Sequence, residues 1–319
     1  MATSGTYVFS VSRDDIIRQA MLNIGKLDAE ESPSAQDTTD LARLLNMQAK
    51  QWQGKTDGSP GLKVWTRKRG YLFLSHTTGT YTVGPGGTGW TNSPRITTTT
   101  SSKAAAATTL NVAAELGIVA GDYIGVQLDS GVLFWTTVVS YVSTTITLTA
   151  GITTASGTGS AVFTYTTTGT QPVYIETAVL RDDTLSDTPL RIIRDVQSYD
   201  VLPQKANPQN ISDPMAIYYE FNLTNGVLRT DVGASQDVTK YIIATYLEAV
   251  QDFNNPLDTP YYPQEWYLAL CWGLSKQAAP MYNAPWTPLM ESNWASAVTI
   301  AMKKDPEIRM DYFQCNEEP

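Results

Sequence analysis

The residue types that most often perform chemistry are scarce in this chain of 319 residues. His76 is the only histidine, so a Ser-His-Asp or a Cys-His arrangement would have to use it. It stands in the sequence LSHTT at the end of a predicted strand, which favours a histidine in a surface turn. The two cysteines, Cys271 and Cys315, are too few for a disulfide framework and lack zinc-ligand spacing. We expect both to be reduced, structural thiols.

Two other motifs have the composition of functional sites but are better explained as turns. The run Gly84-Pro85-Gly86-Gly87 lacks the Lys-Ser/Thr ending of a phosphate-binding loop. Asp182 and Asp183 are adjacent, so on a strand they would point to opposite faces and could not share a proton or a metal ion. We therefore expect no active site, no metal and no cofactor. A site built from scattered carboxylates is the one route to catalysis left open.

Composition and charge narrow the class of protein. With 42% hydrophobic and 17% charged residues, the chain can bury one large core or two ordinary ones. No stretch approaches the roughly 18 apolar residues that span a bilayer, and the N-terminus lacks the pattern of a signal peptide. We expect no membrane association and folding in a cytoplasm. The net charge of −9 disfavours a protein that grips DNA but is compatible with an acidic wall past which DNA slides.

Helical patterns lie at both ends of the chain. Two N-terminal helices begin at capping-box pairs, Ser12 with Asp15 and Ser34 with Asp37. Each pair precedes an apolar stripe, and the second stripe ends at Trp52. Because these two helices cannot bury both stripes on each other, we expect them to pack with the late helices.

The most apolar helix is predicted from Pro263, which suits the first helical position because its φ is fixed and it has no N–H. Two stripes follow on this helix: Trp266, Leu270, Leu274 and Ala278, and beside it Leu268, Trp272 and Ala279. Two stripes predict burial on two sides. Gly273 between them predicts a close approach by a neighbouring backbone.

A last helix is predicted after Thr287, with Pro288 in its first turn. Its stripe includes Trp294. The predicted core of the bundle, on which assembly would depend, consists of Trp52, Trp266, Leu270, Leu274 and Trp294.

The middle of the chain predicts strands. We interpret Arg67, Lys68 and Arg69 as a solvated turn between two short strands at residues 62–65 and 71–74, in preference to a patch that binds a partner. Residues 96–170 are rich in Thr, Ser, Ala and Gly with period-two segments, which predicts an inserted β domain, a small sandwich or barrel. Within it, Asp129-Ser130-Gly131 is predicted as a hairpin turn, and Ile146 and Leu148 alternate with threonines, which predicts one apolar face. Further strands are predicted at residues 173–180, 190–193, 216–221 and 241–250.

The predicted fold class is α+β. One domain combines residues 1–95 and 171–319 and contains a bundle of N- and C-terminal helices and a β-sheet region. Residues 96–170 form the inserted all-β domain, and residues 305–319 form a C-terminal tail.

The order of these features resembles one known family. The capped helical pair, the YTVGPGG turn, the strand ETAVLRDD followed by PLRII, and the segment DTPYYPQEWYLALCWGLSKQAAPMY together resemble the head-to-tail adaptors of tailed bacteriophages, also called tail accessory factors or connectors. The resemblance covers about residues 1–95 and 171–310, and the last segment is its most specific part. The insert is similar to β insertions in some phage adaptor and tail proteins, but small adaptors lack it, so no role is implied for it.

The resemblance implies a structural virion protein at the head–tail junction, assembled in the host cytoplasm. Such adaptors form a ring, commonly of twelve subunits, that sits under the portal, continues the DNA channel and provides the attachment site for tail components. Implied partners are further copies of the chain, the portal protein and a downstream nozzle or tube protein, with tail fibres as a further candidate. Double-stranded DNA would pass through the lumen without specific binding. We expect the C-terminal tail to dock on the portal through Arg309, Met310, Tyr312 and Phe313.

Two other classes of protein stay open. The first alternative is a carbohydrate-binding or cell-wall-acting phage tail protein that uses the Thr-rich insert, although solvated sheet faces are commonly Thr-rich as well. The second alternative is an enzyme. Binding of glycans by the insert would favour the carbohydrate-binding protein, and turnover abolished by a single carboxylate substitution would favour the enzyme.

Overall fold

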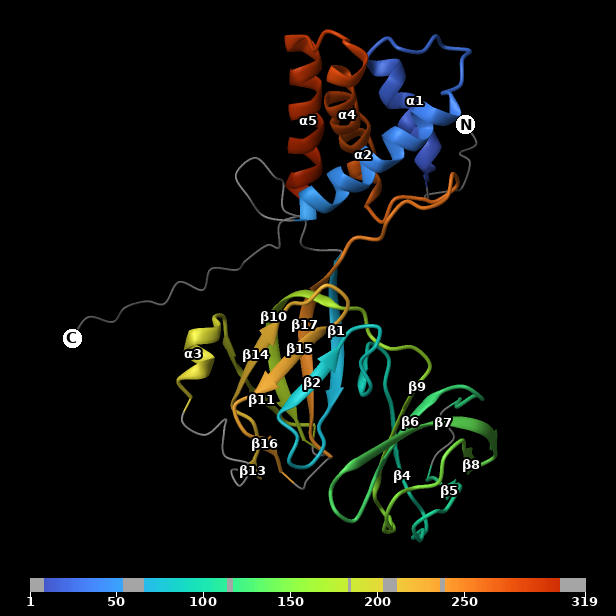
Figure 1. Cartoon of the computed structure of the whole chain (residues 1–319), viewed down its shortest axis with the longest axis vertical. Coiled ribbons are helices and arrows are strands. Elements are labelled where there is room, and N and C mark those ends of the chain that lie inside the picture. The colour runs from blue at the N-terminus through green and yellow to red at the C-terminus, as the bar shows by residue number, and fades with distance from the viewer. Residues whose placement is uncertain are drawn as a thin grey trace, which may run out of the picture. The chain divides into compact units, whose positions relative to one another are not determined.

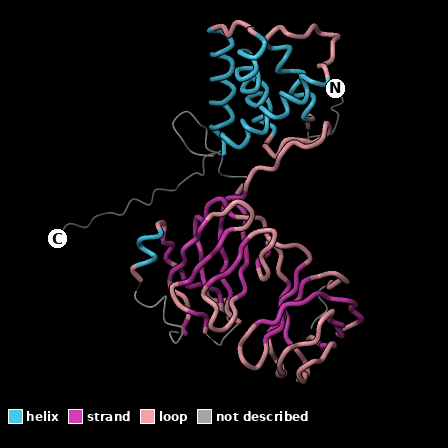
Figure 2. The backbone as a smooth tube through the Cα atoms, viewed as in Figure 1, coloured by secondary structure: helices cyan, strands magenta, loops and turns pink. Residues whose placement is uncertain are grey.

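The computed structural model describes residues 9–53, 66–113, 117–182, 185–202, 211–235 and 239–304. The chain divides into two compact units, a helical unit of Met1–Thr66 with Ala249–Pro319 and a β unit of Arg67–Glu248 (Figures 1 and 2). The fold is α+β, as the sequence predicts. The predicted strand at residues 62–65 and the predicted tail at residues 305–319 lie outside the described residues.

The helical unit joins the two ends of the chain. Its elements are α1 (Arg13–Asn23), α2 (Ala35–Gln53), the 3₁₀ turn η1 (Gln264–Trp266), α4 (Tyr267–Ala278), the 3₁₀ turn η2 (Ala279–Tyr282) and α5 (Pro288–Lys304). Helix α4 packs against each of α1, α2 and α5. The predicted packing of the N-terminal helices with the late helices is therefore confirmed.

Both predicted capping boxes set a helix start. The Ser12 backbone N–H donates to Asp15 Oδ2 over 2.9 Å, and the Asp15 N–H donates back to Ser12 Oγ. The Asp37 N–H donates to Ser34 Oγ over 3.1 Å at the start of α2. The Tyr282 hydroxyl donates to Asp37 Oδ1 over 2.7 Å, so the second cap also ties α2 to the end of η2.

The predicted core residues meet inside the helical unit, with one exception. Trp52, Trp266, Leu270 and Leu274 are all buried in one apolar core, where the rings of Trp52 and Trp266 lie 5.7 Å apart. Trp294 on α5 is only half-buried, with the Lys276 ammonium 3.7 Å from its ring centroid. Apolar side chains and one cation thus share the α4–α5 interface.

Two expectations for the α4 region were wrong. Pro263 has ψ of 152°, so it caps η1 from outside instead of occupying the first helical position. Leu268, in the predicted second stripe, is 56% exposed. Cys271 and Ser275 are buried on α4 instead. The buried Ser275 hydroxyl has a hydrogen-bond acceptor within its own helix, because it donates to the Cys271 carbonyl over 2.7 Å. The apolar periodicity of the sequence therefore predicted only some of the residues that are buried on α4.

Two sheets of the β unit enclose a shared core. The five-stranded sheet has the order β11-β10-β17-β1-β3 and the four-stranded sheet the order β12-β14-β15-β2. The strands of the first are β1 (Arg67–Phe73), β3 (Trp90–Thr91), β10 (Pro172–Arg181), β11 (Asp187–Pro189) and β17 (Tyr241–Glu248). Those of the second are β2 (Thr80–Val83), β12 (Arg191–Ile193), β14 (Ala216–Glu220) and β15 (Gly226–Thr230). Leu72 and Ile242 from the first sheet pack with Ile217 and Leu228 from the second.

Short elements complete these layers. They are the helix α3 (Val196–Asp200), which follows β12, and the parallel pair β13 (Ile211–Ser212) and β16 (Gly233–Ala234). The weakly predicted strand at residues 241–250 is confirmed as β17, which pairs with both β1 and β10.

The predicted solvated turn at Arg67, Lys68 and Arg69 was wrong, because all three residues lie within strand β1. Arg67 pairs with Glu176 on β10 over 2.6 Å, and Lys68 pairs with Glu248 on β17 over 3.4 Å. These carboxylates come from distant parts of the sequence. Because they pair with the basic side chains of β1 across the sheet, a strand that begins with three basic residues can be accommodated there.

A third sheet contains the predicted insert. Its six strands are antiparallel, in the order β4-β9-β6-β7-β8-β5, and the sheet curls into a half-barrel (Figure 1). They are β4 (Arg95–Thr98), β5 (Thr109–Asn111), β6 (Tyr123–Gln127), β7 (Leu133–Val142), β8 (Thr145–Leu148) and β9 (Ala161–Tyr165). Ile146 and Leu148 alternate inward as predicted, and the predicted turn at Asp129-Ser130-Gly131 joins β6 to β7, with φ of 78° at the glycine.

Aromatic rings join this sheet to the rest of the β unit. Phe73 of β1 stacks on Phe163 of β9 with ring centroids 4.1 Å apart, and Tyr165 and Tyr241 lie in the same apolar cluster. The segment that leads into the third sheet and the segment that leads out of it lie side by side, since the Gly169 N–H donates to the Trp90 carbonyl over 2.9 Å.

Removal of the Trp266 side chain tests the core of the helical unit. Trp266→Ala should lower the free energy of unfolding by about 3–5 kcal/mol, because a buried indole leaves a cavity that the surrounding helices fill only in part. Urea unfolding followed by circular dichroism measures the loss. Trp286→Ala, which removes a half-buried indole of the same unit, should cost clearly less. Equal losses in the two variants would contradict this placement.

Acid should weaken the helical unit through its caps. Hydrogen bonds from Ser12 lower the pKa of Asp15, and those from Ser34 and then Tyr282 lower the pKa of Asp37, below the ordinary value of 3.8. A depressed folded-state pKa stabilises the fold above about pH 4, and this stabilisation is lost as the pH falls through the folded pKa. Between about pH 5 and pH 2 the free energy of unfolding should fall less steeply in Asp37→Asn than in the unmodified protein. Identical slopes would show that this carboxylate contributes nothing.

Candidate functional site

Two of the candidate catalytic residues, His76 and Asp182, lie close to the ends of strands in the β unit. His76 lies in a turn, as predicted, but it is half-buried, and its Nδ1 atom has no hydrogen-bond partner among the described residues. Its backbone N–H donates to the Gly131 carbonyl over 3.1 Å, which fastens the β6–β7 hairpin to the end of β1. Asp182 accepts the Ser186 N–H over 2.9 Å, as expected for a turn residue, and Asp183 lies outside the described residues.

Cys271 is a poor nucleophile in this fold. It is buried on α4, and burial raises the pKa of its thiol to about 12. Only the thiolate is strongly nucleophilic, so the side chain serves packing. Cys315 lies outside the described residues.

The residues that the structure describes contain neither a metal-binding cluster nor a membrane-spanning helix. They hold no group of three or more His, Cys, Asp or Glu side chains arranged to bind a metal ion. Within the same residues, each helix is too short or too polar to cross a bilayer.

The contact between α2 and α4 depends on Gly273. A Cβ added there would lie 2.2 Å from Gln48 Nε2 and 2.8 Å from Trp52 Cζ2. Gln48 is fully buried, and its amide atoms have no partner among the residues that the structure describes. The predicted close approach at Gly273 is therefore made by two side chains of α2 and not by a backbone.

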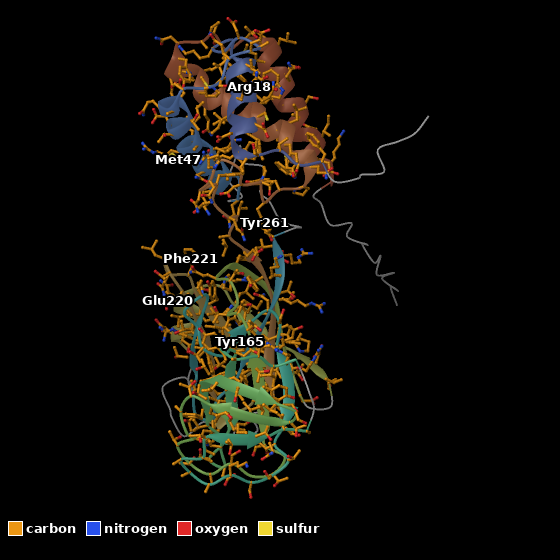
Figure 3. The ribbon with its side chains drawn as sticks, turned by 90° about the vertical axis from the view of Figure 1, so that its right-hand side faces the viewer. Arg18, Met47, Tyr165, Glu220, Phe221 and Tyr261 are labelled. Atoms are coloured by element: carbon orange, nitrogen blue, oxygen red, sulfur yellow. The ribbon has the colours of Figure 1, made fainter. Side chains whose placement is uncertain are left out.

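Helices α2 and α5 both present apolar side chains to solvent. On α5, Leu289 is 71% exposed and Ile300 is 55% exposed, whereas Ala297 and Ala301 of the same helix are buried. On α2, Met47 is 57% exposed (Figure 3). Because α2 and α5 each pack on α4, these outer faces are two separate surfaces of one unit, and we call them the α2 face and the α5 face.

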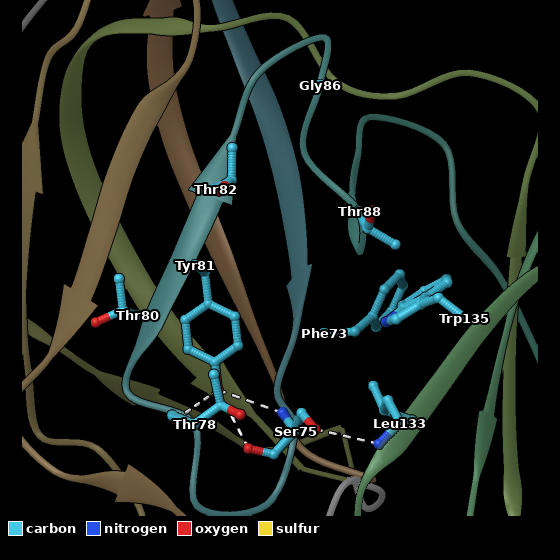
Figure 4. A pocket seen from close by; sticks show the side chains of 10 residues that line it. All are labelled: Phe73, Ser75, Thr78, Thr80, Tyr81, Thr82, Gly86, Thr88, Leu133 and Trp135. Carbon is cyan, nitrogen blue, oxygen red and sulfur yellow. Dashed lines mark hydrogen bonds between the residues drawn. The ribbon is translucent and has the colours of Figure 1, made fainter. Parts of the chain in front are cut away.

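The β unit contains a pocket of about 280 Å³ beside strand β2 (Figure 4). One wall carries Phe73, Leu133 and Trp135, and the other carries the hydroxyl side chains of β2. Two hydrogen bonds hold its floor: Tyr81 donates to the Thr78 carbonyl over 2.8 Å, and the Leu133 N–H donates to Ser75 Oγ over 3.1 Å. Burial raises the pKa of the Tyr81 phenol, so this hydroxyl stays protonated and keeps donating at neutral pH.

A second pocket, of about 450 Å³, lies between α3 and the four-stranded sheet. Tyr199 of α3 stacks on Tyr218 of β14 with centroids 5.2 Å apart, and the Tyr199 hydroxyl donates to the Thr230 carbonyl over 3.1 Å. Glu220 and Arg229 form an ion pair of 3.2 Å in the same lining. Thr80 lines both pockets.

Sequence patterns do not identify the residues of these two pockets as a site. Trp135 and Gly125 face each other in the β6–β7 register, and a glycine opposite a tryptophan is the one local signal that could have identified the first pocket. The second pocket had no such signal, because α3 and β14 are brought together only by the fold. The predicted portal-docking residues, Arg309, Met310, Tyr312 and Phe313, lie outside the described residues.

Comparison of the chain with protein-family models and with curated proteins found no match to either.

A double-mutant cycle tests the packing at Gly273. Gly273→Ala should destabilise the protein by about 1–3 kcal/mol through overpacking, although Ala is the better helix former by about 1 kcal/mol. In a Gln48→Ala background, where the clashing amide is absent, the same substitution should cost less by about 0.5 kcal/mol or more. Additive effects in urea unfolding would show that Gly273 is not needed to admit the Gln48 side chain.

Proposed function

We propose that this chain is a structural head-to-tail adaptor that assembles as a ring under a phage portal. The observation that carries the proposal is the pair of apolar outer faces on the helical unit. Met47 marks the α2 face, and Leu289 and Ile300 mark the α5 face. A ring needs two different, complementary surfaces on each subunit, because a heterologous contact that repeats around an axis closes on itself.

Three further features support the adaptor. The predicted helical pair and the segment from Asp258 to Tyr282, which carry the family resemblance, pack together in one core. The formal net charge of −9 suits a wall beside DNA, since like charge keeps a duplex from adhering to the channel. The β unit offers a separate body on which nozzle, tube or fibre components could attach. In this proposal the C-terminal tail, through Arg309 to Phe313, docks on the portal.

The orientation of the interface follows from the two faces. In the proposed ring the α2 face of one copy packs against the α5 face of the next. Each contact would cover Met47 on one side and Ile300 on the other, both of which are exposed in the single chain. Removing such apolar surface from water favours association by about 25 cal/mol per Å².

An Asp substitution on each of the two faces tests the ring. With portal present, the unmodified protein should form a closed ring in electron micrographs, whereas Met47→Asp and Ile300→Asp should each fail to form one. A mixture of the two variants should stop at dimers, because one supplies an intact α5 face and the other an intact α2 face. Met215→Asp, at a Met that is 74% exposed on the β unit, is the matched control and should leave the ring intact.

A truncation tests the tail separately. A chain that ends before Asp305 should still form rings but should lose its binding to portal in co-sedimentation. A monomeric unmodified protein in the presence of portal would refute the ring, and undiminished portal binding by the truncated chain would refute the docking role of the tail.

A further inference from the structure

The two pockets of the β unit adjoin each other, and this arrangement is independent of any ring. Thr80 on β2 lines both. Strand β2 is the last strand of the four-stranded sheet, so the first pocket borders its free edge and the second borders its outer face. The pockets of about 280 and 450 Å³ therefore meet at Thr80, and we call the two together the β2 groove.

An aromatic platform stands at one end of this groove. Trp135 is half-buried, and its indole rests on Gly125, where an added Cβ would lie 2.7 Å from the ring atoms. Gly89 supports the same ring, with a corresponding distance of 3.1 Å. Phe73 and Tyr165 contact it at centroid distances of 6.0 and 5.6 Å. The indole is thus fixed in orientation before any ligand arrives, which reduces the entropy lost on binding.

The other end of the groove combines a second aromatic ring with charges of both signs. Tyr218 is half-buried and held by its stack on Tyr199. Glu220 and Arg229 lie beside it as an ion pair whose side chains are 41% and 36% exposed, so both keep hydrogen-bonding capacity toward the groove. Asp200 adds a second carboxylate to the same lining. An anionic ligand would therefore meet two carboxylates, whereas the hydroxyl groups of an uncharged ligand can donate to a carboxylate and accept from the Arg229 guanidinium.

We infer that this groove binds a neutral, extended carbohydrate. A sugar ring presents a face of C–H groups that packs on an aromatic ring and a rim of hydroxyls that donates to a carboxylate and accepts from a guanidinium. Trp135 and Tyr218 carry the ring contacts, Glu220 and Arg229 bind hydroxyls, and Thr80 bridges the two ends. Two aromatic rings, one in each pocket, fit a chain of several sugars. The site differs from the carbohydrate alternative drawn from the sequence, because most of it lies on β2, β14, β15 and α3, outside the insert.

The test uses the full chain without portal, so it is independent of the ring. Isothermal titration with maltohexaose, cellohexaose and chitohexaose should detect saturable binding of at least one of them. Trp135→Ala and Glu220→Gln should each weaken that binding about tenfold or more, the change that corresponds to about 1.4 kcal/mol.

Two matched variants serve as controls. Tyr174→Ala removes an aromatic ring that is 46% exposed on β10 and lines neither pocket. Asp187→Asn breaks the ion pair with Arg181, which is as exposed as that of Glu220 and Arg229. Both should bind like the unmodified protein. If Trp135→Ala fails to fold by circular dichroism, Tyr218→Ala takes its place. The absence of binding to all three hexasaccharides at millimolar concentration, or equal binding by the groove and control variants, overturns the inference.

Discussion

The burial of α4 on three sides is the constraint on which the helical unit depends. An apolar helix of this kind is stable only when other elements cover it, and here α1, α2 and α5 do so. Two of these partners precede the whole β unit in sequence and one follows it. The helical unit therefore cannot form until residues separated by about two hundred positions meet, and the β unit is in effect an excursion of the chain between α2 and α4.

Close packing around α4 also explains why its residues are small where they are. Gly273 makes room for Gln48 and Trp52, and Ser275 satisfies its own hydroxyl inside the helix while it accepts the amide of Asn23 over 3.1 Å. Large apolar side chains fill the rest of the same core: Trp52, Trp266, Leu270 and Leu274. Leu268 of α4 and Leu289 and Ile300 of α5 lie outside it and are exposed.

Local signals in the sequence were sufficient at most positions where the structure is local, with Pro263 as an exception. The capping boxes at Ser12 and Ser34, the turn at Gly131 and the alternation around Ile146 all depend on residues within a few positions of one another. The other errors arose where distant partners decide. Arg67 and Lys68 belong to a strand because Glu176 and Glu248 pair with them, and no local pattern contains those carboxylates.

The same reasoning explains what could be predicted of the candidate sites. Trp52, Trp266, Leu270 and Leu274 were identified from helical spacing because a core stripe is a periodic feature. The β2 groove was not identified, because its lining comes from a hairpin, a short helix and the strands β1, β2, β14 and β15, and no sequence periodicity connects these elements. Trp294 shows a third case: its spacing matched a core position, but Lys276 packs over its ring and leaves it half-buried.

The junction between the third sheet and the rest of the β unit determines how such a chain could gain or lose that sheet. Because Trp90 and Gly169 are hydrogen-bonded to each other, a shorter chain could close this point with a tight turn and little loss of backbone order. The aromatic cluster opposes that exchange, since Phe73, Tyr241 and Ile243 would then face water. Gain or loss of the third sheet is therefore a concerted event, in which a module and the three apolar positions beneath it must change together.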